Sequence, residues 1–172
     1  IELGRIVLRA LSYGLGKPKN FFDADYKKPL GRGQLVYYPP MNSKDLKEHR
    51  FGAASHTDFG VLTILLQDMQ GGLQVLNQND EWIEAPPIEN SFVCNIGDLL
   101  ERWTNGDLKS TKHRVINLNK SARYSIPIFC DPASQTIIDP DDFSLSKIKY
   151  EKITAGEHIS NRNKKNFKQY KA

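Results

Sequence analysis

Two histidines and one aspartate restrict the fold of this chain more than any other feature of its sequence. His56 and Asp58 lie two positions apart at the end of a predicted strand, and His113 follows far along the chain. Residues i and i+2 of a strand point to the same face, so the first two side chains can converge on one point. A partner so distant in sequence has to come from another strand. We therefore expect a fold that returns His113 to the side of the other two.

Two imidazoles and one carboxylate form the ligand set typical of mononuclear non-haem iron(II). Such a set occupies one face of the metal and leaves positions open, which O2 and a co-substrate can fill together. On its own, a His-x-Asp pair is a weak signal, because the same two residues are also found in ordinary surface turns. The interpretation gains its strength from the segment that follows His113.

Arg123 and Ser125 form a second i, i+2 pair, in a strand predicted over residues 122–129. A guanidinium group binds a carboxylate through two parallel hydrogen bonds, and a serine hydroxyl adds one more donor. A lone Arg in a strand is usually a surface charge, but this strand is otherwise apolar, and a buried Arg needs an anionic partner. By the same alternation Phe129 points to this face. It is therefore a better candidate for substrate contact than Trp103, which we expect to pack below the site.

Six segments that include these residues occur in one order between about residues 35 and 130. They are LVYYPP from residue 35, SHTDFGVLT from 55, GGLQV from 71, NIGDLLERWTNG from 95, STKHRV from 110 and RYS from 123. Together they resemble the non-haem Fe(II) and 2-oxoglutarate-dependent dioxygenases, specifically the isopenicillin N synthase-like branch. Six motifs in the same order are far more specific than any one of them.

The resemblance implies roles for individual residues. His56, Asp58 and His113 match the iron ligands and hence the catalytic centre of the family. Arg123 and Ser125 match the pair that binds the far carboxylate of 2-oxoglutarate.

Tyr38 matches a tyrosine whose hydroxyl also reaches the co-substrate. A core aromatic residue of the first strand is an equally open reading of this tyrosine. Many relatives carry Asn two residues earlier, whereas this chain has Val36, so it departs from the family pattern on this strand.

The implied reaction is the oxidation of a C–H bond of a small molecule, by hydroxylation or desaturation, with release of succinate and CO2. It needs Fe(II), 2-oxoglutarate and O2, with ascorbate as a further candidate cofactor. Two alternatives stay open. One is an oxidase that does not use 2-oxoglutarate, like isopenicillin N synthase or the aminocyclopropane-carboxylate oxidases, which retain a similar Arg-x-Ser. The other is an inactive, metal-binding jelly roll.

Short strand candidates separated by turn residues predict a mainly β fold. These candidates span residues 34–38, 62–67, 73–76, 82–85, 92–95, 113–117, 122–129 and 136–138. Many short strands indicate a sandwich or barrel, and the double-stranded β-helix, or jelly roll, is the version that hosts such metal sites. We expect flanking amino- and carboxy-terminal helices.

A chain of 172 residues has the size of a single domain. We expect a helical lead-in over about residues 1–30, a barrel over about 33–140 and a helix over about 157–168. Thr154 and Glu157 have the spacing of a capping box before that last helix. Members of the family that it resembles usually carry further helices before the barrel, so we expect this sequence to be an excerpt from a longer polypeptide whose amino-terminal helices are absent from it.

The net charge of +4 is concentrated near the carboxy terminus. Residues 147–172 contain eight Lys or Arg against two Glu. This segment has no groove-reading motif or stacking platform, so we expect a solvated helix face and no nucleic-acid partner.

The chain has no apolar run of membrane-spanning length and no signal-like start, which predicts a cytoplasmic protein without a membrane partner. Cys94 and Cys130 are expected to be buried free thiols.

Three other polar residues are expected to lie outside the site. His49 falls in a polar segment over residues 41–50 that we predict to be an exposed loop. Asp98 is expected in a turn, with its side chain bonding nearby backbone amides. His158 is expected on the surface of the carboxy-terminal helix.

Overall fold

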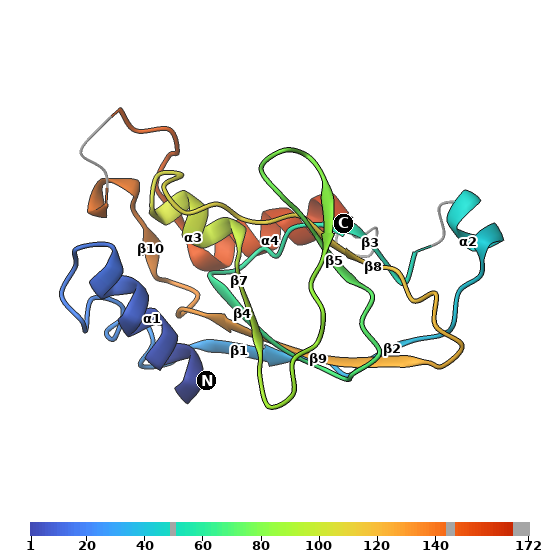
Figure 1. Cartoon of the computed structure of the whole chain (residues 1–172). Helices are drawn as coiled ribbons and strands as arrows, with labels where there is room; N and C mark the ends of the chain where they lie inside the picture. Colours follow the sequence, from blue (N-terminus) through green and yellow to red (C-terminus); the bar gives the residue numbers. More distant parts are fainter. Residues whose placement is uncertain (49–50, 144–146, 167–172) are drawn as a thin grey trace.

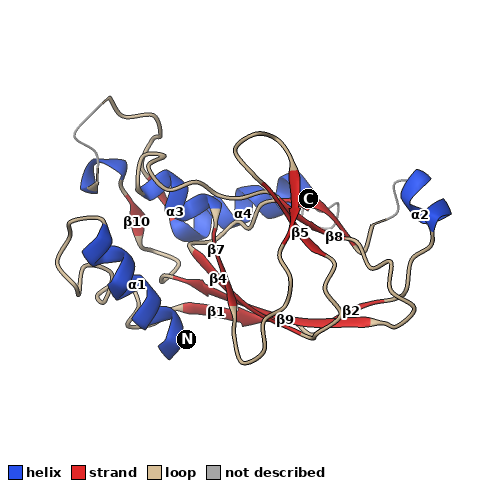
Figure 2. Cartoon of the chain, viewed as in Figure 1, coloured by secondary structure: helices blue, strands red, loops and turns tan. Residues whose placement is uncertain are grey.

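Two antiparallel β-sheets face each other and are flanked by short helices (Figure 1). The computed structural model describes residues 1–48, 51–143 and 147–166. Strands and loops make up most of it, as Figure 2 shows. The arrangement is a jelly roll, which confirms the fold expected from the sequence.

The larger sheet is organised around its longest strand, β9. This sheet has the order β1 (Leu30–Gly33), β9 (Arg123–Asp131), β4 (Leu62–Gln67) and β7 (Val93–Ile96), and β2 (Val36–Tyr38) also pairs with β9. One edge of β9 pairs first with β2 and then with β1, and its other edge pairs with β4. Alternation along β9 buries Arg123 and Ser125 and leaves Tyr124 exposed. The two residues of the predicted carboxylate site therefore face the interior.

The smaller sheet contributes two of the three predicted metal ligands. Its order is β3 (Ala53–His56), β8 (His113–Val115), β5 (Leu73–Leu76) and β6 (Trp82–Glu84). A separate pair is formed by β10 (Ile137–Ile138) and β11 (Ile153–Thr154).

The helices are short and lie around the sheets. They are α1 (Glu2–Gly14), α2 (Ser43–Lys47), α3 (Asp98–Trp103), the 3-10 helix η1 (Pro140–Asp142) and α4 (Ala155–Asn166). Helices α1 and α2 lie at opposite ends of the long strands (Figure 1). No helix in the described ranges combines the length and the apolar character needed to cross a bilayer.

Helix α4 begins two residues earlier than expected. The Thr154 hydroxyl accepts a hydrogen bond of 3.2 Å from the backbone N–H of Glu157, which is the first half of the predicted capping box. Helix α2 is a correction, because it interrupts the segment predicted as a loop. The expected position of His49 lies outside the described residues.

Apolar packing is divided between two clusters of different size. The larger one joins α1, α3 and α4 to the ends of β4 and β9; its buried members are Leu8, Phe22, Tyr26, Val61, Leu62, Ile64, Leu99, Leu100, Trp103, Cys130, Ile138 and Ala155. The smaller one contains only Tyr38, Leu73 and Val115 as buried members and lies between the two sheets. The small second cluster leaves space there, and the predicted site residues line that space.

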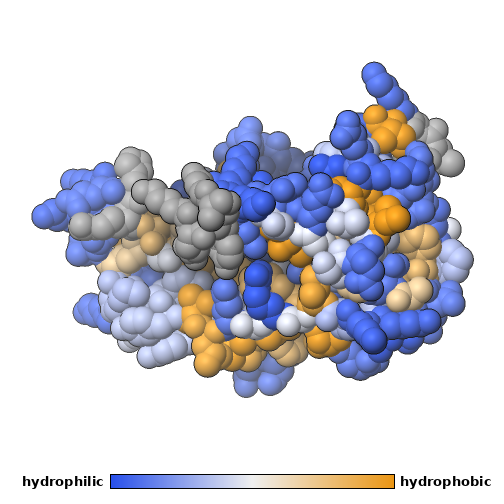
Figure 3. All heavy atoms as spheres, turned by 180° about the vertical axis from the view of Figure 1, so that it is seen from behind, coloured by the Kyte–Doolittle hydropathy of each residue, from blue (hydrophilic) through white to orange (hydrophobic). Residues whose placement is uncertain are grey.

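The view from behind shows hydrophobic residues in several groups among hydrophilic ones (Figure 3). Cys94 is exposed, whereas Cys130 is buried. The expectation of two buried thiols was therefore wrong for Cys94. Its neighbours Val93 and Asn95 face the interior, so strand alternation turns Cys94 outward.

Candidate metal centre and co-substrate pocket

Strand pairing brings the three predicted metal ligands together. His56 at the end of β3 lies directly opposite His113 in β8, and their ring centroids are 4.3 Å apart. The register of β3 shifts between Ala53 and His56, and such irregularities re-aim side chains near functional sites. Asp58 lies just beyond the strand. His56 and His113 thus come from the smaller sheet, and Asp58 comes from the loop after β3.

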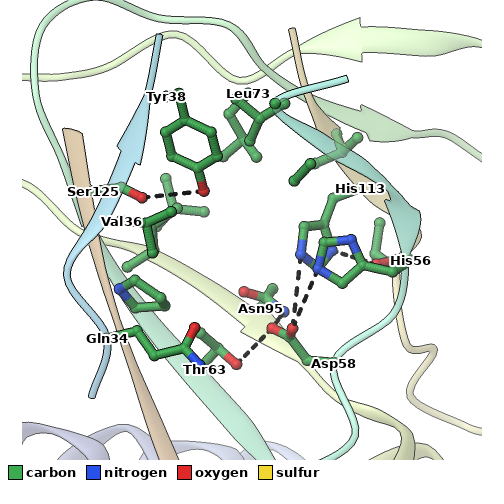
Figure 4. Close-up of a pocket in the computed structure, with 18 of the residues that line it drawn as sticks. Gln34, Val36, Tyr38, His56, Asp58, Thr63, Leu73, Asn95, His113 and Ser125 are labelled. Carbon is green, nitrogen blue, oxygen red and sulfur yellow. Dashed lines mark hydrogen bonds and ion pairs between the residues drawn. The ribbon is translucent and has the colours of Figure 1, made fainter. Parts of the chain in front are cut away.

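One carboxylate oxygen of Asp58 faces both imidazoles, and dashed lines join it to each ring in Figure 4. Oδ1 of Asp58 is 3.9 Å from Nε2 of His56 and 3.8 Å from Nε2 of His113. One ligand atom from each residue lies within 4.8 Å of the other two. A single cation can therefore contact all three.

Hydrogen bonds orient both imidazoles with Nε2 toward this point. Nδ1 of His56 lies 2.7 Å from the carbonyl oxygen of Ala54, and Nδ1 of His113 lies 3.1 Å from that of Thr111. A proton on each Nδ1 leaves Nε2 with the free lone pair that a metal needs. Burial lowers the pKa of His113, which favours the neutral, ligating form.

The second carboxylate oxygen of Asp58 is held by two polar side chains. Oδ2 accepts hydrogen bonds of 2.6 Å from the Thr63 hydroxyl and 2.7 Å from the Asn95 amide. Thr63 and Asn95 are direct partners in the β4–β7 ladder. Because these donors bind Oδ2, Oδ1 is left for a cation. Sequence reasoning missed both residues, although Asn95 belongs to a motif that it had singled out.

Helix α3 supports the backbone of the same loop. The backbone N–H of Asp98 donates to the carbonyl of Asp58 at 2.8 Å, and that of Leu99 donates to Gly60 at 3.0 Å. Asp98 is the first residue of α3. Its side chain pairs with Arg162 at 2.8 Å, so the expected turn with Asp98 bonding nearby amides was wrong.

A cavity of about 240 Å³ extends from these ligands between the two sheets. Apart from Asp58 and Arg123, its lining is uncharged or consists of the two histidines. The lining residues are Gln34, Val36, Tyr38, Gly52, Ala53, His56, Asp58, Thr63, Leu65, Leu73, Val75, Val93, Asn95, Thr111, His113, Val115, Arg123, Ser125, Pro127 and Phe129. All six predicted site residues face this one space.

Arg123 is a fully buried cation with spare hydrogen-bond donors. Its side chain has 0% exposure, and Nη2 donates to Oε1 of Gln67 at 2.9 Å. Nε and Nη1 are buried without a hydrogen-bond partner in the described part of the chain. A buried guanidinium with two unused donors is costly unless an anion completes its shell. This arrangement fits the carboxylate of a ligand.

Tyr38 and Ser125 lie beside this cation. The guanidinium carbon of Arg123 is 4.8 Å from the centre of the Tyr38 ring, and the two hydroxyl oxygens are 3.5 Å apart. Tyr38 is a buried member of the smaller cluster and also lines the cavity. Both readings of this tyrosine, as a core aromatic residue and as a pocket residue, therefore agree with the structure. Val36 also lines the cavity and offers no hydrogen bond there.

Of the two aromatic candidates for substrate contact, only one lines the cavity. Phe129 lines the cavity as expected, whereas Trp103 packs in the larger cluster and donates from Nε1 to Asp142 at 2.8 Å. His158 is buried with 9% exposure, so its predicted surface position was wrong. Burial lowers its pKa to about 4.

Comparison with known proteins gives one consistent family. A model described as the 2OG-Fe(II) oxygenase superfamily matches residues 33–132. Homoarginine-6-hydroxylase 2-ODD-C23 of Glycine max is 35% identical over 175 residues, which cover 96% of this chain and 53% of that protein. A 1-aminocyclopropane-1-carboxylate oxidase of Dictyostelium discoideum is 37% identical over 165 residues, covering 79% of this chain and 45% of that protein.

A solved structure shows the same arrangement. It is that of a full-length Neurospora crassa protein in complex with alpha-KG and thymine, with a TM-score of 0.89 and 37% sequence identity. The match covers 96% of this chain and 53% of that one. The chain therefore spans about half the length of the relatives that it matches.

Proposed function

The chain belongs to the 2OG-Fe(II) oxygenase superfamily, and from this premise we propose that it oxidises a C–H bond of a small molecule with Fe(II), O2 and 2-oxoglutarate. The proposed iron ligands are Nε2 of His56, Oδ1 of Asp58 and Nε2 of His113. We also propose that the chain forms a single jelly-roll domain.

The proposed use of 2-oxoglutarate rests on the environment of Arg123. Its buried guanidinium has two unpaired donors and lines the same cavity as the three ligands. Its one side-chain acceptor, Gln67, is neutral, so the positive charge is left for a ligand. We assign the far carboxylate of 2-oxoglutarate to Arg123, with hydroxyl donors from Ser125 and Tyr38 beside it.

The residues of the chain position and shield the reactants. The two Nδ1 hydrogen bonds hold the imidazoles in the ligating tautomer, and Thr63 and Asn95 fix the rotation of the Asp58 carboxylate. When bound, iron with its co-substrate supplies the oxidising power for a C–H bond. Apolar lining residues such as Val93 and Phe129 exclude water from that bond and hold it near the metal.

Succinate release tests the proposal. We expect this chain, supplied with Fe(II), 2-oxoglutarate and O2, to form succinate, and small molecules that are substrates to accelerate it. Asp58→Ala should abolish succinate formation, whereas Asp107→Ala, which removes an exposed carboxylate, should leave it unchanged. Undiminished turnover in the Asp58 variant would refute the assignment.

A second candidate is an oxidase that consumes O2 without 2-oxoglutarate. The similarity to a relative named 1-aminocyclopropane-1-carboxylate oxidase favours this candidate. In such an oxidase, the Arg-x-Ser pair would bind a carboxylate of a molecule other than 2-oxoglutarate. The two candidates differ in stoichiometry. One succinate for each O2 consumed supports 2-oxoglutarate use, and O2 uptake without succinate supports the oxidase.

The substrate is proposed to be a small molecule, in line with the Neurospora crassa neighbour that was solved in complex with thymine. The compartment is proposed to be the cytoplasm, because Cys94 and Cys130 are both free thiols and unpaired cysteines are typical of reducing compartments.

A further inference from the structure

Arg162 of α4 reaches the loop that carries Asp58. Its Nη2 lies 2.8 Å from Oδ2 of Asp98 and donates to the hydroxyl oxygen of Thr57 at 3.0 Å. The Thr57 hydroxyl in turn donates to Oδ2 of Asp98 at 3.3 Å. The expectation of a solvated basic face was therefore wrong for this residue. Arg162 closes a three-membered polar cluster next to the metal ligands.

Helix α4 also holds the residue on the other side of Asp58. The guanidinium carbon of Arg162 is 4.8 Å from the centre of the Phe59 ring. His158, one helical turn earlier, forms a hydrogen bond with the backbone of Phe59. The two residues on α4 thus contact both sequence neighbours of Asp58.

The backbone of Asp58 is tied to the same cluster. Asp98, the carboxylate partner of Arg162, donates its backbone N–H to the Asp58 carbonyl at 2.8 Å. Asp58 lies outside β3, so no strand ladder sets its position. Its orientation depends on these contacts and on the two donors to Oδ2.

We propose that Arg162 is a positioning residue for the metal centre. It sets metal affinity by holding Thr57, the residue before Asp58, and Asp98, whose backbone N–H binds the Asp58 carbonyl. This inference rests on the proposed function of Asp58 as a metal ligand. Arg162 does not line the cavity, so it acts only through these partners. A residue that merely fastened α4 to the domain would affect folding and leave the affinity of the folded protein for metal unchanged.

Mn(II) binding to the chain separates these roles. Bound Mn(II) loses the electron paramagnetic resonance signal of the free ion, so the dissociation constant can be measured without turnover. Arg162→Met keeps an apolar stem against Phe59 and removes both polar contacts. We expect it to weaken Mn(II) binding about tenfold or more, as outer partners of metal ligands commonly do. Lys165→Met makes the same charge change at an exposed position of α4 and should bind like the unmodified chain.

Two further variants make the outcome decisive. Arg162→Lys retains the positive charge but carries it on a shorter side chain without the planar guanidinium, and should recover part of the affinity. Thr57→Val removes one hydroxyl without changing charge, and we expect a smaller weakening in the same direction. This variant decides the question if Arg162→Met does not fold.

The contrary results are distinct. If the unmodified chain binds Mn(II), and both Arg162→Met and Thr57→Val bind it with the same dissociation constant, Arg162 has no positioning role and the proposed function stands. If the unmodified chain itself binds no Mn(II), the proposed function and this inference fall together.

Discussion

The amide of Asn95 donates a hydrogen bond of 2.7 Å to Oδ2 of Asp58. This contact joins β7 to the loop after β3 and assigns different tasks to the two carboxylate oxygens. Oδ2 is occupied by Asn95 and Thr63, and Oδ1 faces the two imidazoles at 3.8 and 3.9 Å. The carboxylate is thus already oriented for the proposed metal, which would lower the free-energy cost of binding that metal.

Removing the amide of Asn95 should weaken metal binding. For Asn95→Leu we expect a loss of about tenfold to a hundredfold in Fe(II) affinity, because the freed carboxylate can rotate. Calorimetric titration under anaerobic conditions measures this change. Cys94→Ser is the matched control, since Cys94 is the preceding residue and is exposed. An unchanged affinity in Asn95→Leu would contradict the role given to the amide.

Replacing Arg123 should separate co-substrate binding from metal binding. For Arg123→Met we expect the affinity for 2-oxoglutarate to fall by about thirtyfold or more, since loss of one partner of a buried charged pair costs about 2–5 kcal/mol. Fe(II) affinity should remain. The metal-free variant should be at least as stable as the unmodified chain, because a buried cation with unpaired donors is gone.

Arg114→Met provides the control for this change. Arg114 donates from Nε to Gln74 at 2.7 Å and lies against Trp82, outside the cavity. It should leave 2-oxoglutarate binding unaltered. Equal losses in both variants would mean that positive charge in general, and not the Arg123 site, attracts the co-substrate.

Gly60 should not tolerate a side chain. A Cβ on this residue would collide with the carboxylate of Asp131, which is itself held by the backbone N–H of Val61 at 2.8 Å. We expect Gly60→Ala to lower the free energy of unfolding by about 1–3 kcal/mol, the usual range for overpacking. Gly14→Ala, where a Cβ meets nothing within 4 Å, should be neutral or stabilising. Urea denaturation of both variants checks the contrast.

Two buried groups should change the free energy of unfolding in opposite directions as the pH rises. Burial raises the pKa of Asp131 from 3.8 to about 6, so the stability that it contributes is present below about pH 4 and is lost as the pH rises through about 6. Burial lowers the pKa of His158 from 6.5 to about 4. Its contribution is present above pH 6.5 and is lost as the pH falls through about 4.

Asp131→Asn should expose the His158 effect. The Asn side chain keeps an acceptor for Val61 and removes the titration of residue 131. The free energy of unfolding of this metal-free variant should therefore rise more steeply between pH 4 and pH 6.5 than that of the unmodified chain. Denaturant titrations across this range provide the test, and parallel pH profiles would show that Asp131 does not titrate as described.

Local sequence patterns predicted the elements that carry the site. Strands β4 and β5 have the bounds expected from their apolar runs and the glycines or polar residues that flank them. Alternation correctly turned Arg123 and Ser125 inward, since period-2 geometry is a property of a single strand. Strand β1 was missed, because Leu30–Gly33 contains two glycines and is exposed throughout.

Contacts between distant elements could not be predicted. Thr63 and Asn95 meet at Asp58 through the register of β4 against β7, which depends on how the whole sheet packs. His158 lies in a strongly polar helix, yet it is buried because α4 packs against the loop after Asp58. Neither relationship leaves a pattern in a single segment of the sequence.

The most direct test of the central claim is an anaerobic titration of the chain with Fe(II) and 2-oxoglutarate, followed by visible absorption. We predict a weak charge-transfer band that saturates at one Fe(II) per chain and is absent from Asp58→Ala. A folded, unmodified chain that gives no such band, or an Asp58→Ala variant that gives the same band, would contradict the assignment of His56, Asp58 and His113 as the iron site.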